Sequence, residues 1–191
     1  MKKVLVFLTD GFADWEASYV TAELNKSWTD YQVQTVAIDK DPKVSMGGLT
    51  VLPDYSMDDL PETFSMLIMP GGTTWREEKN QQAKKLVKDC FEKNITVAAI
   101  CDATTFLGMH GFLDHHKHTG NSLPFLKEGA PDYRGEEHYI NQQSVRDEGL
   151  ITANGTGAIE FAKNILEELK IYEGEDLQEW YELFKIGSVR A

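Results

Sequence analysis

The chain has 191 residues and a formal net charge of −12, because 31 Asp and Glu residues outnumber 19 Lys and Arg residues. It is 41% hydrophobic and 26% charged, as ordinary globular proteins are, and a chain of this length buries a core without disulfides or a structural metal. A negative field repels phosphate, and the basic residues are scattered, so we expect neither nucleic acid nor an anionic membrane as a partner. We expect a single domain over residues 1–191.

The N-terminal sequence places two lysines before an apolar run at residues 4–8, as a signal peptide would. That run is too short for a signal sequence, and Asp10 and Asp14 follow it closely, so it predicts a buried first strand. No stretch reaches the roughly 18 apolar residues of a membrane span. With two cysteines and no metal-type cysteine spacing, the sequence indicates a reducing, cytoplasmic setting.

Short apolar runs alternate with helical patterns along the chain, which predicts an α/β sandwich with a mostly parallel sheet and helices on both faces. The expected strands are residues 4–8, 33–38, 66–69, 96–100 and 150–153. The expected helices are residues 13–26, a stripe of Ala83, Leu86, Val87, Cys90 and Phe91, residues 156–170 and residues 176–184. Residues 44–52 predict an inserted β-hairpin, and residues 120–150 an excursion with short strands.

A hydrophobic strand runs directly into Cys101, and a helical pattern starts immediately after it. The flanking residues Ala99 and Ala103 are small, as a tight strand-to-helix elbow requires. Such an elbow presents a nucleophile at the carboxyl edge of the sheet, and the helix N-terminus favours its thiolate, so we expect appreciable thiolate at neutral pH. The alternative is a buried cysteine that packs as a small apolar side chain.

Cys90 receives the opposite interpretation. It falls on the apolar stripe of a predicted amphipathic helix, where burial disfavours the thiolate. We expect Cys90 to be inert and to pack in the core.

Two further segments leave predicted strands at the same edge. Gly71 and Gly72 follow residues 66–69, and their N–H groups, together with the N–H of Asp102, are candidates to bind an oxyanion. Glu16 lies after the first strand, in the first turn or so of a helix. An ordinary glycine turn and a solvated helix carboxylate are the plainer alternatives.

Taken together, these segments resemble the ThiJ/PfpI family, in the class I glutamine amidotransferase-like superfamily. The resemblance rests on Pro70-Gly71-Gly72, on AICDA around Cys101, on the early Glu16 and on NGTG at residues 154–157, and it spans about residues 2–170. It leaves residues 171–191 as a C-terminal helical extension. It implies a flavodoxin-like three-layer sandwich with a nucleophile elbow at Cys101, Glu16 beside the sulfur as a protonated or proton-sharing partner, and a homodimer.

The sequence also departs from the branches of that family. The intracellular-protease branch has a histidine directly after the cysteine, where this chain has Asp102, and the glutaminase branch uses a late His-x-Glu pair that does not occur after Ala153. The deglycase and glyoxalase-like branch often has a histidine about twenty residues beyond the cysteine. Alignment places Asn121 there, and His118, three residues earlier, is the candidate substitute for the missing imidazole, although it would point differently on a strand.

Two other groups of residues admit plainer interpretations. His110, His115, His116 and His118 suggest a metal site, but adjacent histidines rarely bind one ion, so we expect no metal and no cofactor. Aromatic residues near the motifs, Phe12, Trp15 and Trp75, are candidates for lining a pocket, for core packing or for a dimer contact.

Two functional hypotheses follow. In the first, Cys101 attacks a small carbonyl, amide or ester substrate, the Gly72 and Asp102 N–H groups bind the oxyanion, and Glu16 or His118 moves the proton. In the second, the same cysteine serves reversible oxidation or ligand capture as a sensor, without turnover. Glutamine amidotransfer and intracellular proteolysis are less favoured because the imidazole that they use is missing.

Overall fold

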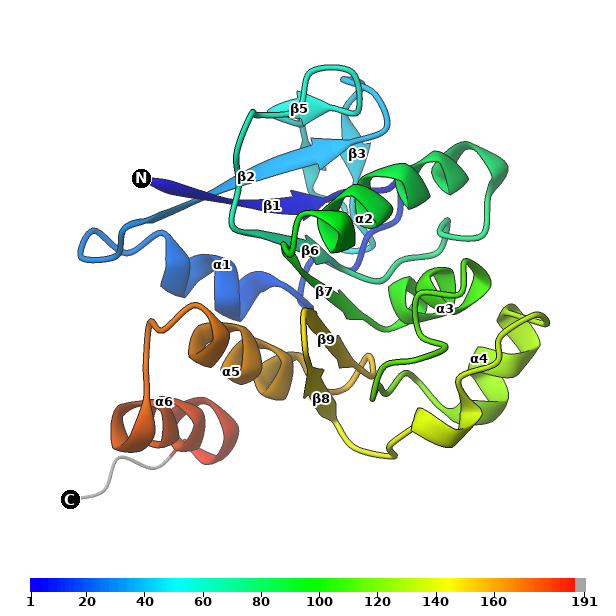
Figure 1. Ribbon diagram of the computed structural model, residues 1–191. Coiled ribbons are helices and arrows are strands. Elements are labelled where there is room, and N and C mark those ends of the chain that lie inside the picture. The colour runs from blue at the N-terminus through cyan, green and yellow to red at the C-terminus, as the bar shows by residue number, and fades with distance from the viewer. Residues whose placement is uncertain (188–191) are drawn as a thin grey trace.

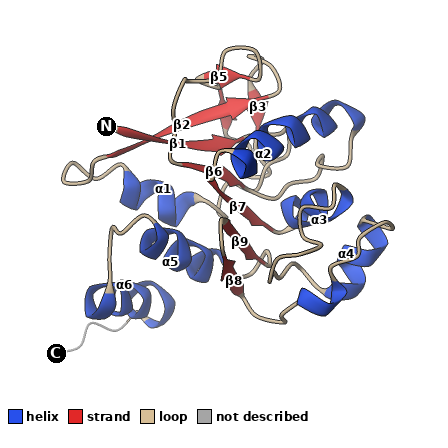
Figure 2. Cartoon of the chain, in the orientation of Figure 1, coloured by secondary structure: helices blue, strands red, loops and turns tan. Residues whose placement is uncertain are grey.

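The computed structural model describes residues 1–187, so the last four residues of the expected extension 171–191 lie outside the described part. A seven-stranded sheet runs through the molecule in the order β5-β2-β1-β6-β7-β9-β8 (Figures 1 and 2). Neighbouring strands are parallel except β8, which pairs antiparallel with β9. The strands of this sheet are β1 (Lys2–Phe7), β2 (Tyr31–Ala37), β5 (Tyr55–Ser56), β6 (Met66–Met69), β7 (Thr96–Ile100), β8 (Ser144–Asp147) and β9 (Leu150–Ala153).

The apolar runs identify the interior strands well. The observed β6, β7 and β9 have the expected bounds, and each of their residues is buried except Thr96, which is half-buried. The first two strands begin two residues earlier than their apolar runs, because β1 pairs with β2 from Lys2 opposite Tyr31 onward. Backbone pairing therefore extends beyond the side chains that reach the core.

Helices cover both faces of the sheet (Figure 1). Alternate residues of β1 belong to the two cores. Val4 and Val6 pack toward one helical layer, and Leu5 and Phe7 pack toward the other. The first layer consists of α1 (Ser18–Leu24), α5 (Ala158–Glu168) and α6 (Gly174–Ile186), and the second of α2 (Ala83–Glu92), α3 (Asp102–Met109) and α4 (Leu123–Gly129). This arrangement is the expected α/β sandwich.

Two expectations about helices were wrong in detail. The first helix begins only at Ser18, so Glu16 lies in the turn before the helix and not in its first turn. The segment 120–150, expected to hold short strands, contains α4 and a single short strand, β8. The Ser122 side chain caps α4 by accepting the Phe125 N–H at 3.2 Å, and Pro124 occupies its first turn, where a missing N–H costs little.

The expected hairpin at residues 44–52 is present as a separate two-stranded antiparallel sheet. It consists of β3 (Lys43–Val44) and β4 (Thr50–Val51). The Asp14 carboxylate accepts hydrogen bonds from the Ser45 hydroxyl at 2.5 Å and from the Gly47 N–H at 3.1 Å. The hairpin is thereby fixed to the loop that carries Glu16.

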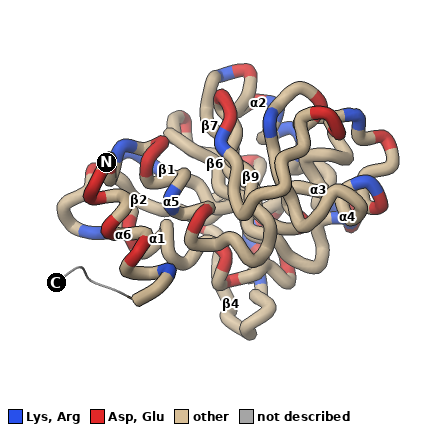
Figure 3. Tube along the Cα trace, turned by 90° about the horizontal axis from the view of Figure 1, so that it is seen from below, with Lys and Arg blue, Asp and Glu red and all other residues tan. Residues whose placement is uncertain are grey.

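The charged residues are dispersed over the molecule. Viewed from below, segments with Lys and Arg and segments with Asp and Glu are both scattered over the trace (Figure 3). Several form exposed ion pairs, such as Lys127–Glu136 at 2.7 Å, and pairs of this kind contribute little to stability. Among the described residues, no helix combines the length and the apolar character needed to span a bilayer.

Candidate active site

Cys101 occupies a strained backbone position between β7 and α3. Its φ of 60° and ψ of −129° are unusual for a residue with a side chain, and such a conformation costs on the order of 1–3 kcal/mol. The position is fixed from both sides, since the Cys101 N–H donates to Ala153 O at 3.0 Å and its carbonyl accepts the Thr104 N–H and hydroxyl at 3.1 and 2.6 Å. This is the geometry of a nucleophile elbow, and it leaves Cys101 partly exposed.

The loop after β6 brings Glu16 to the sulfur. Gly71 donates its N–H to Glu16 Oε2 at 2.6 Å. A Cβ atom at Gly71 would lie 2.8 Å from Glu16 Oε2 and 3.0 Å from Cys101 Sγ, so only glycine fits between the two side chains. Glu16 is 1% exposed, and its second oxygen, Oε1, has no hydrogen-bond partner among the described residues. An unpaired buried carboxylate oxygen beside a thiol is suited to hold a proton.

Burial shifts the proton affinities of this pair. Desolvation raises the pKa of Glu16 to about 7, although the Gly71 N–H and polar contact with Cys101 oppose the shift. Desolvation and the charge of Glu16 also raise the pKa of Cys101 to about 11. The expectation of appreciable thiolate at neutral pH was therefore wrong, because burial and the nearby carboxylate outweigh the helix N-terminus. Near pH 7 the thiol is protonated, and the Glu16 carboxyl group beside it changes between its protonated and ionised forms.

Asn121, and not His118, contacts the thiol. Asn121 Nδ2 donates to Cys101 Sγ at 3.4 Å, while Asn121 Oδ1 accepts the Gly155 N–H at 2.9 Å. The second bond fixes the orientation of the amide, so that its NH2 group faces sulfur. A hydrogen bond from Asn121 favours the thiolate and is among the influences that lower the pKa of Cys101.

His118 lies in the interior with both ring nitrogens engaged. It is fully buried, Nδ1 donates to the His116 carbonyl at 2.6 Å, and Nε2 accepts the Tyr133 hydroxyl at 2.6 Å. Burial lowers the pKa of His118, which keeps the ring neutral. The structure does not bring this histidine to Cys101, so the hypothesis of a His118 proton shuttle is replaced by a structural role. The three-residue offset between His118 and Asn121 directs the two side chains to different partners.

Asp102 carries a partner that the sequence did not reveal. Its carboxylate forms an ion pair with Arg76, with Arg76 Nη2 and Asp102 Oδ1 at 2.8 Å. Arg76 lies four residues after Gly72, and no feature of that loop marks it as a site residue. The sequence does not predict the Arg76–Asp102 pairing, because this pairing depends on how the loop after β6 passes α3.

The proposed oxyanion donors are the backbone N–H groups of Gly72 and Asp102. Gly72 and Phe12 form an isolated antiparallel bridge. The hydrogen bonds of this bridge are donated by the neighbouring residues, from Ala13 N to Gly71 O and from Thr73 N to Gly11 O. The N–H of Gly72 takes no part in them. Asp102 is the first residue of α3, and its N–H faces the sulfur. The Gly71 N–H, in contrast, is already taken by Glu16.

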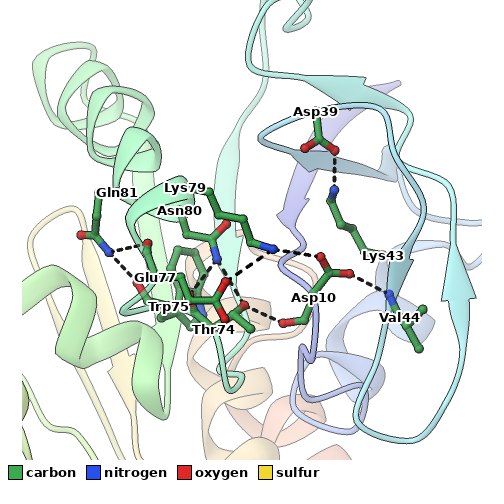
Figure 4. Close-up of polar contacts among 10 residues, drawn as sticks. All are labelled: Asp10, Asp39, Lys43, Val44, Thr74, Trp75, Glu77, Lys79, Asn80 and Gln81. Atoms are coloured by element: carbon green, nitrogen blue, oxygen red, sulfur yellow. Dashed lines mark hydrogen bonds and ion pairs between the residues drawn. The ribbon is translucent and has the colours of Figure 1, made fainter.

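A polar network fixes these loops relative to one another (Figure 4). The Asp10 carbonyl accepts the Thr74 hydroxyl at 2.6 Å, and the Asp10 carboxylate contacts Lys79 Nζ at 3.3 Å and the Val44 N–H at 3.4 Å. Asn80 donates to Thr74 O at 2.7 Å. The network joins the loop after β1, the loop after β6 and the β3–β4 hairpin, and so positions Glu16 against Gly71.

The other candidate residues have structural roles. Trp75 is fully buried between Phe7 and Phe106, with ring centroids 5.5 and 4.9 Å away, and its Nε1 donates to Pro70 O at 2.8 Å. Phe12 belongs to the core, and Trp15 is 46% exposed. Burial raises the pKa of Cys90 to about 12.

His110 and His116 contact residues other than Cys101. His110 contacts Gln81 at 2.9 Å, and His116 contacts Asp147 at 3.2 Å. Within residues 1–187, no three His, Cys, Asp or Glu side chains are grouped so as to hold a metal ion. The histidine segment thus contributes packing and surface contacts to the described structure.

Comparisons with known proteins agree on one family. The profile of the DJ-1/PfpI family matches residues 2–168. The Bacillus subtilis proteins named uncharacterized protease YdeA and uncharacterized protease YoaZ are 38% and 36% identical, over 98% and 96% of this chain and 93% and 91% of their own lengths. The crystal structure of a thiJ/pfpI family protein from Bacillus anthracis superposes with a TM-score of 0.93 at 36% identity, covering 98% of this chain and 92% of that one.

These matches confirm both the resemblance seen in the motifs and the flavodoxin-like sandwich. They extend over the elbow, the Glu16 turn and the Gly71 loop alike. The chain therefore belongs to the DJ-1/PfpI family.

Proposed function

We propose that this chain is a cysteine-dependent enzyme acting on small carbonyl compounds, with Cys101 as the nucleophile and Glu16 as the group that takes up and returns the proton. The observation that carries the proposal is the pairing of a strained, partly exposed cysteine with a buried carboxylate that has one unpaired oxygen. A carboxyl group with a pKa of about 7 is well matched to proton transfer at neutral pH.

The first chemical step needs only the groups present. Cys101 sulfur attacks the carbonyl carbon of an aldehyde, its proton passes to Glu16, and the C=O π bond opens to an alkoxide that the Gly72 and Asp102 N–H groups stabilise. The proton then returns from Glu16 to the alkoxide oxygen, giving a neutral hemithioacetal. No imidazole is required for this addition, which is why the arrangement favours carbonyl addition.

Peptide hydrolysis is supported less well, although two relatives carry the name protease. Cleaving an amide requires a group that protonates the leaving amine and activates water. Asp102 occupies the position after the cysteine, and His118 is bonded to Tyr133 and His116. The chain therefore offers a nucleophile without the imidazole that such hydrolysis uses.

Reversible oxidation of Cys101 is the second candidate function, and Asn121 favours it. An amide that donates to sulfur stabilises an anionic sulfur group but cannot shuttle a proton as imidazole does. With peroxide, one oxygen atom is transferred to sulfur and water leaves, which gives a sulfenic acid beside Asn121 and Glu16.

Assays with a panel of substrates distinguish the two candidate functions. A 2-oxoaldehyde, an ester, glutamine and an unstructured peptide are tested with wild type, Cys101→Ala and Glu16→Gln. We expect turnover of the 2-oxoaldehyde that both substitutions abolish, while a His118→Ala control retains it. Turnover that survives Cys101→Ala contradicts the proposal, and a reactive thiol without turnover of any substrate favours the redox function.

A further inference from the structure

The Arg76–Asp102 pair lies beside the reactive cysteine and has features that ordinary surface ion pairs lack. Asp102 follows Cys101 directly in the chain, at the start of α3, and its side chain is only 13% exposed. The Arg76 side chain is 41% exposed, but its terminal Nη2 is the atom that contacts Asp102 Oδ1 at 2.8 Å. The Asp102 charge is therefore largely removed from water. In this environment its influence on neighbouring groups is screened less than it would be in solvent.

Contacts from α4 hold the guanidinium in place. Arg76 Cζ lies 5.0 Å from the centre of the Phe125 ring. A Cβ atom at Gly129 would lie 2.9 Å from Arg76 Cζ and 2.4 Å from Thr105 Cγ2, so the backbone of α4 packs closely over both the guanidinium and α3. A clamped arginine loses less conformational entropy on pairing than a free surface side chain.

The Arg76–Asp102 pair bears on the site because the charge of Asp102 acts on Glu16, which in turn acts on the Cys101 thiol. Glu16, from the turn before α1, is the charged group that acts on Cys101 directly. Asp102, from α3, acts on Glu16 through its charge, and Arg76, from the loop after β6, contacts Asp102. The segments around residues 121 and 155 contribute only a neutral amide and a backbone N–H. Of the two carboxylates, Asp102 is the one with a cationic partner. The charge of Asp102 also helps to raise the pKa of Glu16.

We propose that Arg76 is a positioning residue for the Cys101–Glu16 pair, acting by neutralising the Asp102 carboxylate. This inference rests on the proposed function, since it assigns a cause to the reactivity of the same thiol. Without Arg76, the full charge of Asp102 opposes both ionisation of Glu16 and the build-up of negative charge on sulfur during attack. The Arg76 side chain need not touch the substrate to have this effect.

A double-mutant cycle tests the inference. We compare wild type with Arg76→Met, Asp102→Asn and the double variant. The measured quantity is the rate at which iodoacetamide alkylates Cys101 from pH 5 to 9, followed by peptide mass mapping. Thermal melts check that each variant is folded. We expect Arg76→Met to slow alkylation at pH 7 about threefold to tenfold, and to move the midpoint of the pH profile upward by about half to one pH unit. In the Asp102→Asn background the same substitution should change neither the rate nor the midpoint.

Matched variants separate charge from packing. Arg76→Lys keeps the charge while losing the planar contact with Phe125, so its midpoint should stay near that of wild type. Arg76→Gln replaces Arg76→Met if the latter fails to fold. Equal slowing in both Asp102 backgrounds, or no slowing in either, overturns the inference and leaves the proposed function intact. Wild-type Cys101 that labels no faster than Cys90 overturns the proposed function itself, and the inference with it.

Discussion

Gly71 joins Glu16 to Cys101: its N–H holds the carboxylate at 2.6 Å, and the space where its side chain would stand is occupied by Glu16 Oε2 and Cys101 Sγ. Three loops that leave β1, β6 and β7 at the carboxyl edge of the sheet meet at this point. The site therefore depends on the order of the parallel strands, which brings residues 16, 71 and 101 together.

The two cysteines should differ sharply in reactivity. Cys101 is partly exposed at the elbow, whereas Cys90 is fully buried on α2, where reagents cannot reach it without local opening. Limiting peroxide or iodoacetamide should modify Cys101 first, as peptide mass mapping after graded exposure would report. Equal labelling of both, or faster labelling of Cys90, would remove the case for a functional elbow.

Replacing His118 should affect stability and leave the thiol unchanged. His118→Ala removes a fully buried ring and leaves the Tyr133 hydroxyl without its 2.6 Å partner, so we expect a loss of about 2–3 kcal/mol in the free energy of unfolding. Chemical denaturation measures that loss. The rate of Cys101 alkylation should stay within about twofold of wild type. A large fall in alkylation by a folded His118→Ala protein would restore the shuttle hypothesis.

Asn121 should support the thiol through its donor group. Asn121→Asp keeps an oxygen for the Gly155 N–H but turns the group facing Sγ into a carboxylate, which raises the pKa of the Cys101 thiol further. We expect alkylation at pH 8 to slow by about tenfold, against a smaller change in Asn121→Ala. Stopped-flow or mass-spectrometric rates would detect this. If the two variants behave alike, the amide contact has no electrostatic role.

Much of this architecture was predictable from residue patterns, and the failures have local causes. The bounds of β6, β7 and β9 follow from buried apolar runs, and the elbow follows from small residues around Cys101. The Gly, Pro and charged residues of segment 120–150 indicate a loop and so do not predict α4, although Ser122 followed by Pro124 is itself a capping signature.

The contacts of side chains across loops were less accessible to sequence reasoning. Whether His118 or Asn121 reaches the sulfur depends on the backbone path of a segment that forms only an isolated bridge, between His118 and Tyr139. Arg76 and Asp102 are 26 residues apart, and no pattern links them. The sequence also identifies a helix N-terminus at Cys101 without revealing how strongly burial and Glu16 oppose the thiolate.

The buried carboxylate should make stability depend on pH. The pKa of Glu16 is about 7 in the folded protein and about 4.5 when exposed, so the unfolded chain releases this proton first as pH rises. Wild type should lose up to about 3 kcal/mol of stability between pH 4.5 and 7 relative to Glu16→Gln, which has no ionisable group there. Urea unfolding of both proteins at pH 4.5 and 7.5 measures the difference. If the difference in the free energy of unfolding between the two proteins is the same at both pH values, burial does not raise the pKa of Glu16.

The pH profile of Cys101 alkylation in wild type and Glu16→Gln tests the central claim most directly. Below pH 7, Glu16 is protonated and cannot take the thiol proton, so the wild-type rate should rise as the carboxyl group, with its pKa of about 7, ionises, and then level off. Glu16→Gln should show no step near pH 7 and should react only as its thiol ionises at alkaline pH. Identical profiles for the two proteins would contradict the assignment of Glu16 as the proton acceptor of Cys101.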